Sequence, residues 1–216
     1  MAYREGTPRL HLFDMDGTLI RGSAAAVDIF RQLGMLEEIA ALERQFGARG
    51  IGPPEYAEAV HALWQDLTEA HVAAAFVAAP WLAGIREVWR EIRERGDYCA
   101  VISLSPSFFV ERLLNWGVHA AHGSRFPDLP FSRPVDPTGI LSAAAKVKIA
   151  NRLCAEFGVG LDACVAYGDS MSDAEIFATV PVTVAVNADR HLVGLATHCY
   201  TGGDLREAYE LVGNPG

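Results

Sequence analysis

Short apolar runs alternate with segments of helical periodicity along most of this chain. The apolar runs, rich in β-branched and aromatic residues, are 10–13, 98–102, 164–167, 182–186 and 198–200. The segments with helical spacing are 85–95, 108–116, 143–157, 173–178 and 205–212. Because strands that alternate with helices form βα units, the pattern predicts an α/β fold with a Rossmann-like, mainly parallel sheet.

The stretch between the first and second apolar runs has a different character. Residues 21–79 are rich in alanine and patterned for three or four helices, with no convincing strand. Pro53 and Pro54 are placed to open one of these helices at its first turn. We therefore expect a core domain formed by residues 1–20 and 81–216, with a small all-helical cap, residues 21–80, inserted after the first strand. Motion at the two linkers would let such a cap cover a site.

The segment after the second apolar run is too short for another folded insertion. We expect it to contain the helix at 108–116, then a strand, and then a β-hairpin within residues 122–140.

Composition restricts the classes of partner. Half of the 216 residues are hydrophobic, and the formal net charge is −9, with a pI near 5.2. Nucleic acids and lipid surfaces need clustered Lys and Arg, so we expect neither nucleic-acid nor membrane binding, and favour a small-molecule partner. The sequence shows no apolar leader and no run long enough to span a bilayer, and its four cysteines lack metal-site spacing. A cytoplasmic protein, monomeric or homodimeric, is expected.

Polar side chains follow three of the predicted strands at the point where each strand ends. They are Asp14 and Asp16, Ser103, and Asp169 and Asp173, while Lys146 and Lys148 lie near the start of a helical segment. In isolation, each has an ordinary structural explanation as a turn residue, a helix-terminal acid or a surface lysine. The carboxyl ends of parallel strands, however, meet at one edge of a sheet. Four carboxylates with a hydroxyl and an ammonium are suited to Mg²⁺ and a phosphoryl group, so the sequence predicts a magnesium site.

Three of these segments resemble motifs of a known family. The stretches "DMDGT", "AVIS" and "GDSMSD" are similar to motifs one, two and four of the haloacid dehalogenase-like hydrolase superfamily. Lys146 resembles the motif-three lysine, with Lys148 as the alternative. The resemblance covers nearly the whole chain. The insertion between motifs one and two resembles the phosphoserine-phosphatase-like branch (subfamily IB), which carries a helical cap of the C1 type.

This resemblance implies a role for each site residue. Asp14 would be the nucleophile that forms an aspartyl-phosphate, and Asp16 the general acid and base. Mg²⁺ would be held by Asp14, the backbone carbonyl of Asp16, and Asp169, with Asp173 either binding through water or holding Lys146. Ser103, the backbone N–H of Leu104 and Lys146 would bind the phosphoryl oxygens.

The resemblance also implies an activity. A carboxylate at Asp16 is typical of family members that hydrolyse phosphate esters, so we expect a magnesium-dependent phosphatase acting on a small-molecule phosphate monoester. One alternative is a phosphotransferase that passes the phosphoryl group to an alcohol. A non-catalytic binding domain with the same fold is the other.

The cap residues provide a further expectation about the substrate. Arg21, Ser23, Arg49 and Tyr56, with His61 and Trp64, are the candidates for substrate specificity, and favour a neutral hydroxylated or aromatic leaving group. Phosphoserine phosphatases have an acid nine positions after the nucleophile, where this chain has Ser23. They also have an arginine on the cap helix that corresponds to residues 54–65, which here contain no Lys or Arg. We therefore expect a poor phosphoserine phosphatase.

Overall fold

A parallel six-stranded sheet forms the centre of the molecule. The computed structural model describes residues 7–48 and 50–212. The strands are β1 (Leu10–Phe13), β2 (Tyr98–Pro106), β3 (Ala120–Ser124), β4 (Cys164–Gly168), β5 (Val182–Val186) and β6 (His198–Tyr200), in the order β3-β2-β1-β4-β5-β6. All neighbouring pairs are parallel, and Leu10 pairs with Tyr98 on one side and Cys164 on the other. The predicted α/β fold with a parallel sheet is confirmed.

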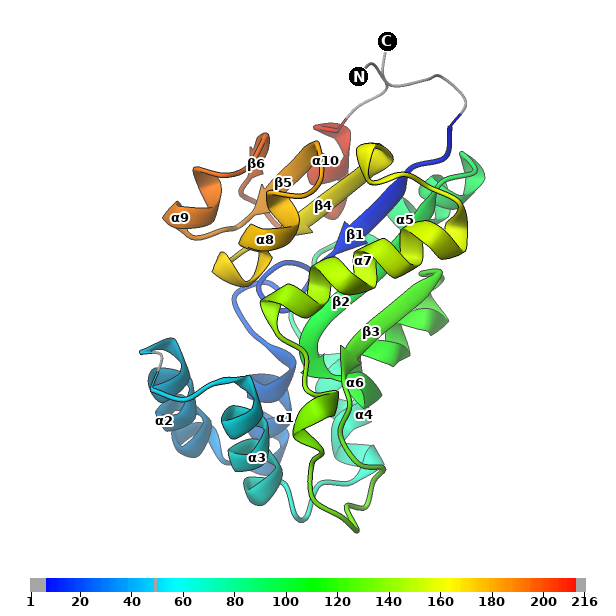
Figure 1. Cartoon of the computed structure of the whole chain (residues 1–216). Coiled ribbons are helices and arrows are strands. Elements are labelled where there is room, and N and C mark those ends of the chain that lie inside the picture. Colours follow the sequence, from blue (N-terminus) through cyan, green and yellow to red (C-terminus); the bar gives the residue numbers. More distant parts are fainter. Residues whose placement is uncertain (1–6, 49, 213–216) are drawn as a thin grey trace.

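Helices cover both faces of this sheet, because alternate strand residues point to opposite sides. Leu10 and Leu12 of β1 belong to one core cluster, and Phe13 belongs to the other. The first cluster packs under α7 (Ala143–Phe157), α8 (Ala174–Phe177) and α9 (Arg190–Val193), and the second under α5 (Ile85–Glu94) and α10 (Leu205–Glu210). The sheet is therefore buried between two helical layers (Figure 1). No helix in the described part of the chain is both long and apolar enough to cross a bilayer.

Four helices lie between β1 and α5 in the described chain. They are α1 (Ala25–Leu33), α2 (Leu36–Gly47), α3 (Pro53–Leu63) and α4 (Glu69–Ala78), and Figure 1 shows them beyond the end of β1. Pro53 and Pro54 occupy the first turn of α3, as the sequence predicts. The segments that enter and leave this helical insertion lie side by side: the N–H of Arg21 donates to the Pro80 carbonyl, and the N–H of Leu82 to the Leu19 carbonyl, each at 2.9 Å. Two adjacent connections therefore join the insertion to the sheet.

The predicted β-hairpin within residues 122–140 is wrong. Between β3 and α7 the chain contains no strand, and the only helical turn in that segment is the 3-10 turn Pro137–Gly139. Prolines at 127, 130, 134 and 137 supply no N–H for a ladder. The aromatic side chains pack on the insertion instead: the ring of Phe126 lies 5.9 Å from Trp64, and that of Phe131 lies 4.5 Å from His61.

Short helical turns replace some longer predicted helices. The predicted helix at 108–116 is α6 (Ser107–Val110) followed by the 3-10 helix Glu111–Trp116. The predicted helix at 173–178 is the 3-10 turn Met171–Asp173 followed by α8. Another 3-10 turn, Leu161–Ala163, leads into β4. Two of these short turns lie directly after β2 and β4, where the polar site residues are found.

Candidate active site

Asp14 lies at the carboxyl end of β1, in the middle of the sheet. Its N–H donates to the Tyr167 carbonyl at 2.9 Å, which continues the pairing with β4 and fixes its backbone. The side chain is 6% exposed, and its Oδ2 accepts a hydrogen bond from Thr18 Oγ1 at 3.1 Å. Burial raises the pKa of Asp14 well above its ordinary value, and the Lys146 ammonium opposes that shift.

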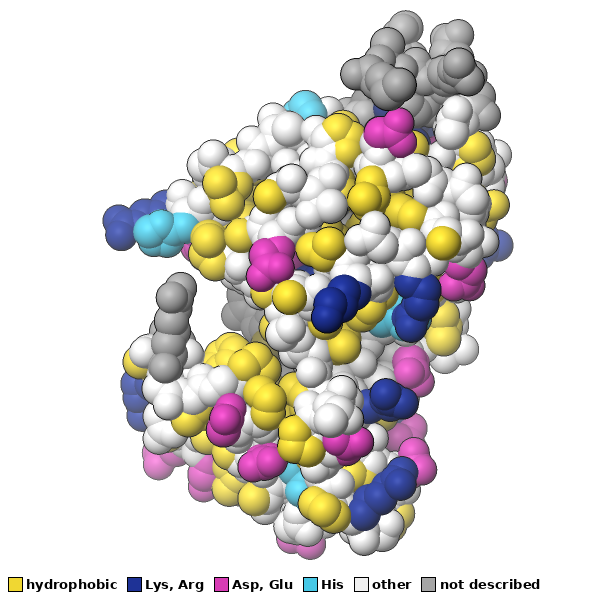
Figure 2. Space-filling model, viewed as in Figure 1, with side chains coloured by type: hydrophobic (Ala, Val, Ile, Leu, Met, Phe, Trp, Pro, Cys, Tyr) yellow, Lys and Arg dark blue, Asp and Glu magenta, His cyan; other side chains and the backbone are white. Residues whose placement is uncertain are grey.

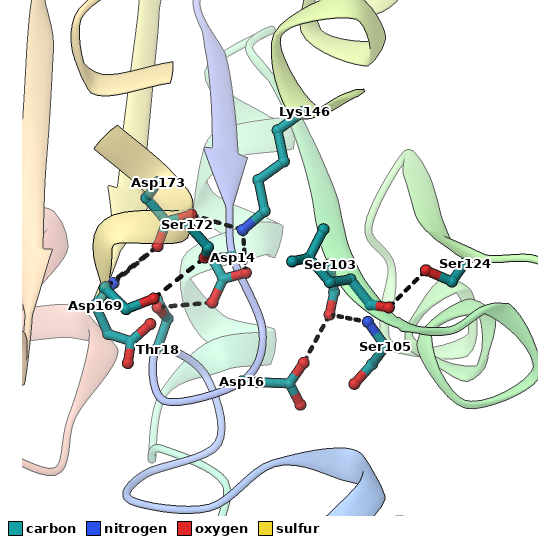
Figure 3. A network of polar contacts seen from close by, with 12 residues as sticks. Asp14, Asp16, Thr18, Ser103, Ser105, Ser124, Lys146, Asp169, Ser172 and Asp173 are labelled. Atoms are coloured by element: carbon teal, nitrogen blue, oxygen red, sulfur yellow. Dashed lines mark hydrogen bonds and ion pairs between the residues drawn. The ribbon is translucent and has the colours of Figure 1, made fainter. Parts of the chain in front are cut away.

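Lys146 bridges two of the site carboxylates. Its Nζ donates hydrogen bonds to Asp14 Oδ1 and Asp173 Oδ1, each at 2.6 Å, and the residue is 1% exposed. Burial alone would lower the pKa of Lys146, but the two carboxylates outweigh this effect and raise it. The lysine therefore carries its positive charge at neutral pH. Lys148 is exposed on the same helix, so the structure brings Lys146, and not Lys148, into the site (Figure 3).

Three carboxylates gather beside this lysine. Oxygens of Asp14, Asp169 and Asp173 all lie within 4.8 Å of one another. Burial and the neighbouring Asp173 raise the pKa of Asp169 to about 7. One ammonium cannot compensate three carboxylates, two of them buried and Asp169 half-buried, and a divalent cation would favour their ionised forms. A set of hard oxygen donors at this spacing fits Mg²⁺.

Two glycines allow these acids to approach. Gly17 has a φ of +79°, and a Cβ built on it would lie 2.0 Å from Asp169 Oδ2. A Cβ on Gly168 would lie 2.5 Å from Asp173 Cγ. Asp173 is held in turn by the N–H groups of Asp169 and Ser170, which donate to its Oδ2 at 3.2 and 3.4 Å. The Gly in each motif is therefore required by the packing of a carboxylate against the backbone.

Asp16 points away from the lysine and toward β2 (Figure 3). Its Oδ2 accepts from Ser103 Oγ at 2.8 Å, and its Oδ1 accepts from the N–H of Ala25 at 2.7 Å. Ala24, the N-cap residue of α1, has no side chain that could accept a hydrogen bond from the first turn of the helix. Asp16, which lies outside the helix, accepts the hydrogen bond from the N–H of Ala25 instead. This contact joins the second aspartate of the motif directly to the helical insertion.

The end of β2 is irregular beside Asp16. The pairing with β3 shifts register between Ile102 and Pro106. Ser103 is fully buried, and its Oγ also accepts from the N–H of Ser105 at 3.0 Å. Leu104 lines a cavity next to these groups. The irregular part of β2 is therefore the part that contacts Asp16, through Ser103.

This cavity has a volume of about 540 Å³ and lies between the strand ends and the helical insertion. Asp14, Asp16 and Asp169 line one end. The remaining walls are largely apolar and include Ala24, Val27, Phe46, Pro53, Ala57, Val60, Trp64, Phe126, Ile140 and Leu141. On the face seen in Figure 2, a notch separates α9 at the sheet edge from the insertion. The volume of the cavity is suited to a small organic ester.

Only some of the predicted specificity residues lie at the cavity. Ser23, Tyr56 and Trp64 line the cavity, whereas Arg21 and His61 are not among its lining residues, and Arg21 is exposed on the surface. Arg49 lies outside the described residues. Ser23 does not face the cavity as a free hydroxyl, because its Oγ donates to Asp28 Oδ1 at 3.0 Å.

Two charged residues that line the cavity were not predicted from the sequence. Arg31 of α1 lines the cavity and forms an ion pair with Asp28, which is 1% exposed. Glu43 of α2 lines it as well, and its Oε1 accepts from Tyr56 Oη at 2.5 Å. The charge pattern of α1 and α2 resembles that of any solvated helix, so no local signal marks these two residues.

Known proteins are similar to this chain over most of its length. A sequence model of the family described as haloacid dehalogenase-like hydrolase matches residues 11–178. A phosphoserine phosphatase of Methanocaldococcus jannaschii is 25% identical over 210 residues, which cover 96% of this chain and 99% of that protein. A phosphoserine phosphatase of Archaeoglobus fulgidus is 26% identical over 192 residues, which cover 87% of this chain and 55% of that protein.

Solved structures give the same result for the fold. A substrate-bound phosphoserine phosphatase complex superposes with a TM-score of 0.81 at 24% identity, covering 96% of this chain and 99% of the other. A structure described as a phospho-aspartyl intermediate analogue of phosphoserine phosphatase has a TM-score of 0.79 at 25% identity, covering 95% and 99%. The chain therefore belongs to the haloacid dehalogenase-like hydrolase family, in its phosphoserine-phosphatase-like branch.

Proposed function

We propose that this protein is a magnesium-dependent phosphatase that hydrolyses a small-molecule phosphate monoester through an aspartyl-phosphate on Asp14. The observation that carries the proposal is the placement of the two motif-one aspartates. Asp14 lies in the cluster with Lys146 and the other acids, while Asp16 is held apart by Ser103 and Ala25. A nucleophile and an acid–base group are thus separated by their hydrogen-bond partners.

The residues suited to the metal are Asp14, Asp169 and Asp173, together with the backbone carbonyl of Asp16. Bound Mg²⁺ would offset the charge of the phosphate and of the acidic cluster. Lys146, Ser103 and the N–H of Leu104 would hold the nonbridging phosphoryl oxygens, where negative charge develops in the transition state.

The first chemical step forms the covalent intermediate. A carboxylate oxygen of Asp14 attacks phosphorus, and the bond between phosphorus and the ester oxygen breaks. Asp16 gives its proton to that oxygen, so the leaving group departs as a neutral alcohol while the phosphoryl group stays on Asp14. The Ser103 and Ala25 contacts hold the Asp16 side chain on the side of the cavity from which the alcohol departs.

The second step reverses the role of Asp16. Its carboxylate accepts a proton from water while the water oxygen attacks phosphorus, and the bond to Asp14 breaks. Inorganic phosphate and the starting enzyme result. Nucleophilic catalysis accelerates the reaction because it replaces one difficult displacement by two easier ones.

We further propose that the helical insertion acts as a cap. Residues 1–20 and 81–216 form the core, and residues 21–80 form the cap that closes over the cavity. The adjacent connections at Arg21 and Leu82 and the bond from Ala25 to Asp16 support this division, because a motion of the cap would be transmitted to the acid–base group.

The test is hydrolysis of an aryl phosphate by the purified protein. We expect phosphate release that requires Mg²⁺ and is abolished by excess EDTA. The Asp14→Asn variant should fall to background, whereas Asp66→Asn, at an exposed site on the insertion, should keep full activity. A phosphorylated peptide containing Asp14 should be trapped with a fast-leaving substrate. Label on a serine or histidine would disprove the nucleophile, and release only with an added alcohol acceptor would indicate a phosphotransferase.

A further inference from the structure

One wall of the cavity carries a negative charge that the chemistry at phosphorus does not use. Arg31 and Glu43 are the charged lining residues contributed by the insertion within residues 7–48 and 50–212. Arg31 is already paired with the buried carboxylate of Asp28. Glu43 forms no ion pair with any described residue, so the wall retains one uncompensated negative charge.

Glu43 lines the cavity together with a pair of aromatic side chains, one of which it contacts. Tyr56 Oη donates to its Oε1 at 2.5 Å, and the rings of Tyr56 and Phe46 pack with centroids 4.9 Å apart and an interplanar angle of 45°. Both rings line the same cavity as Glu43. A carboxylate beside aromatic rings is the combination that binds an organic ammonium, through charge and through the ring faces.

Glu43 and Tyr56 line the same cavity as Asp14 and Asp16 at the reacting end. Burial raises the pKa of Tyr56 above its ordinary value, and the charge of Glu43 and, more weakly, that of Asp16 add to the shift. The hydroxyl of Tyr56 therefore stays protonated and continues to donate to Glu43. A group on the leaving alcohol that reaches Tyr56 lies in the same compartment as Asp16, which protonates the departing oxygen.

We propose that Glu43, with Tyr56 and Phe46, forms a binding site for a cationic amine, so that the preferred substrates are phosphate monoesters of amino alcohols. This rests on the proposed function and specifies its substrate class. It replaces the neutral leaving group expected from sequence, because that expectation did not include Glu43. The amine would supply the missing positive charge, and Mg²⁺ and Lys146 would hold the phosphate at the other end of the cavity.

The experiment compares matched pairs of substrates. Aminoalkyl phosphates with two to four carbons are compared with the hydroxyalkyl phosphates of equal length. We expect kcat/KM to favour the amine by about tenfold or more at one chain length or more. Glu43→Gln keeps an acceptor for Tyr56 but removes the charge, so it should abolish the preference, mainly through KM, and leave the hydroxyalkyl and aryl phosphates within about twofold. Glu38→Gln, exposed on the same helix, should keep the preference.

A binding measurement separates this inference from the proposed function. Calorimetry with the Asp14→Asn variant and Mg²⁺ should show the same preference for the amine in Kd, and Asp14→Asn/Glu43→Gln should lose it. If aryl phosphate is not hydrolysed but the amine preference appears in binding, the proposed function fails and the amine site stands. If aryl phosphate is hydrolysed but the amine and hydroxyl esters are equivalent in kcat/KM and Kd, or the preference survives Glu43→Gln, the amine site is disproved.

Discussion

Lys146 Nζ donates a hydrogen bond to Asp14 Oδ1 at 2.6 Å, across a separation of 132 residues. The same nitrogen holds Asp173, so one buried ammonium links the end of β1 to the turn after β4. This contact connects the stability of the site to its chemistry, because the group that would bind a phosphoryl oxygen also compensates the acids.

Lys146→Met should therefore reduce both stability and activity. Removing the cation leaves Asp14 and Asp173 buried without their partner, which we expect to lower the free energy of unfolding by about 3 kcal/mol. We expect kcat/KM for an aryl phosphate to fall by about 10²-fold or more. Urea unfolding and steady-state kinetics measure the two effects. Lys148→Met, two residues further along the same helix, is the control and should resemble the wild type in both.

Gly17→Ala should damage the proposed Mg²⁺ site specifically. A methyl group would clash with Asp169 Oδ2, and the backbone φ of +79° adds strain. Gly34→Ala is the matched control, because Gly34 has a φ of +72° and nothing within 4 Å of its Cβ position. Both variants should lose about 1 kcal/mol of stability from strain. Only Gly17→Ala should raise the Mg²⁺ concentration needed for half-maximal activity, and an equal change in both variants would contradict the predicted clash.

Asp16→Asn should leave phosphate binding intact and slow turnover by about 10²- to 10⁴-fold, the loss expected for a general acid–base group. The amide can still accept the hydrogen bond from Ala25, so the helical insertion should remain in place. In single-turnover measurements of phosphoenzyme formation, the rate should fall most for alkyl phosphates and least for nitrophenyl phosphate, whose leaving group needs no proton. An equal loss for both leaving groups would mean that Asp16 is not the acid.

O-phosphoserine should be a poorer substrate than 2-aminoethyl phosphate. Its carboxylate would enter a compartment that already holds Glu43, and the guanidinium of Arg31 is paired with Asp28. The comparison of kcat/KM for the two esters measures this. A preference for O-phosphoserine would show that Arg31 accepts the carboxylate, and Arg31→Gln would then remove that preference.

His11 should make the fold sensitive to acid. Burial, with smaller effects of Arg9 and Arg95, lowers the pKa of His11 to about 3, whereas in the unfolded chain it stays near 6.5. Below pH 6.5 the unfolded state binds a proton that the native state excludes, so stability is lost as pH falls from 6.5 toward 3. At pH 5 this costs about 2 kcal/mol. Urea unfolding of the wild type and of His11→Gln at pH 7 and pH 5 should show a smaller pH dependence in the variant.

The strand pattern and the acidic motifs follow from local sequence. The apolar runs predict β1, β5 and β6 at their observed bounds, because alternation and β-branched residues are local signals. The approach of Asp14, Asp169 and Asp173 to one sheet edge follows from the rule that parallel strands end together. The predicted hairpin was wrong because its segment packs by contacts between Phe126 and Phe131 and a distant helix, which no local pattern encodes.

Tertiary structure alone decided which residues of each helix face the site. Lys146 and Lys148 are two positions apart, about 200° around the helix, and only the packing of α7 on the sheet determines which of them is buried. Glu43 and Arg31 reach the cavity for the same reason, because the alanine-rich insertion can present several faces and its docking beyond the strand ends selects one. The sequence by itself therefore determined the strands and the acids that follow them, through short-range periodicity, whereas the lysine and the cavity charges depended on contacts between residues far apart in the chain.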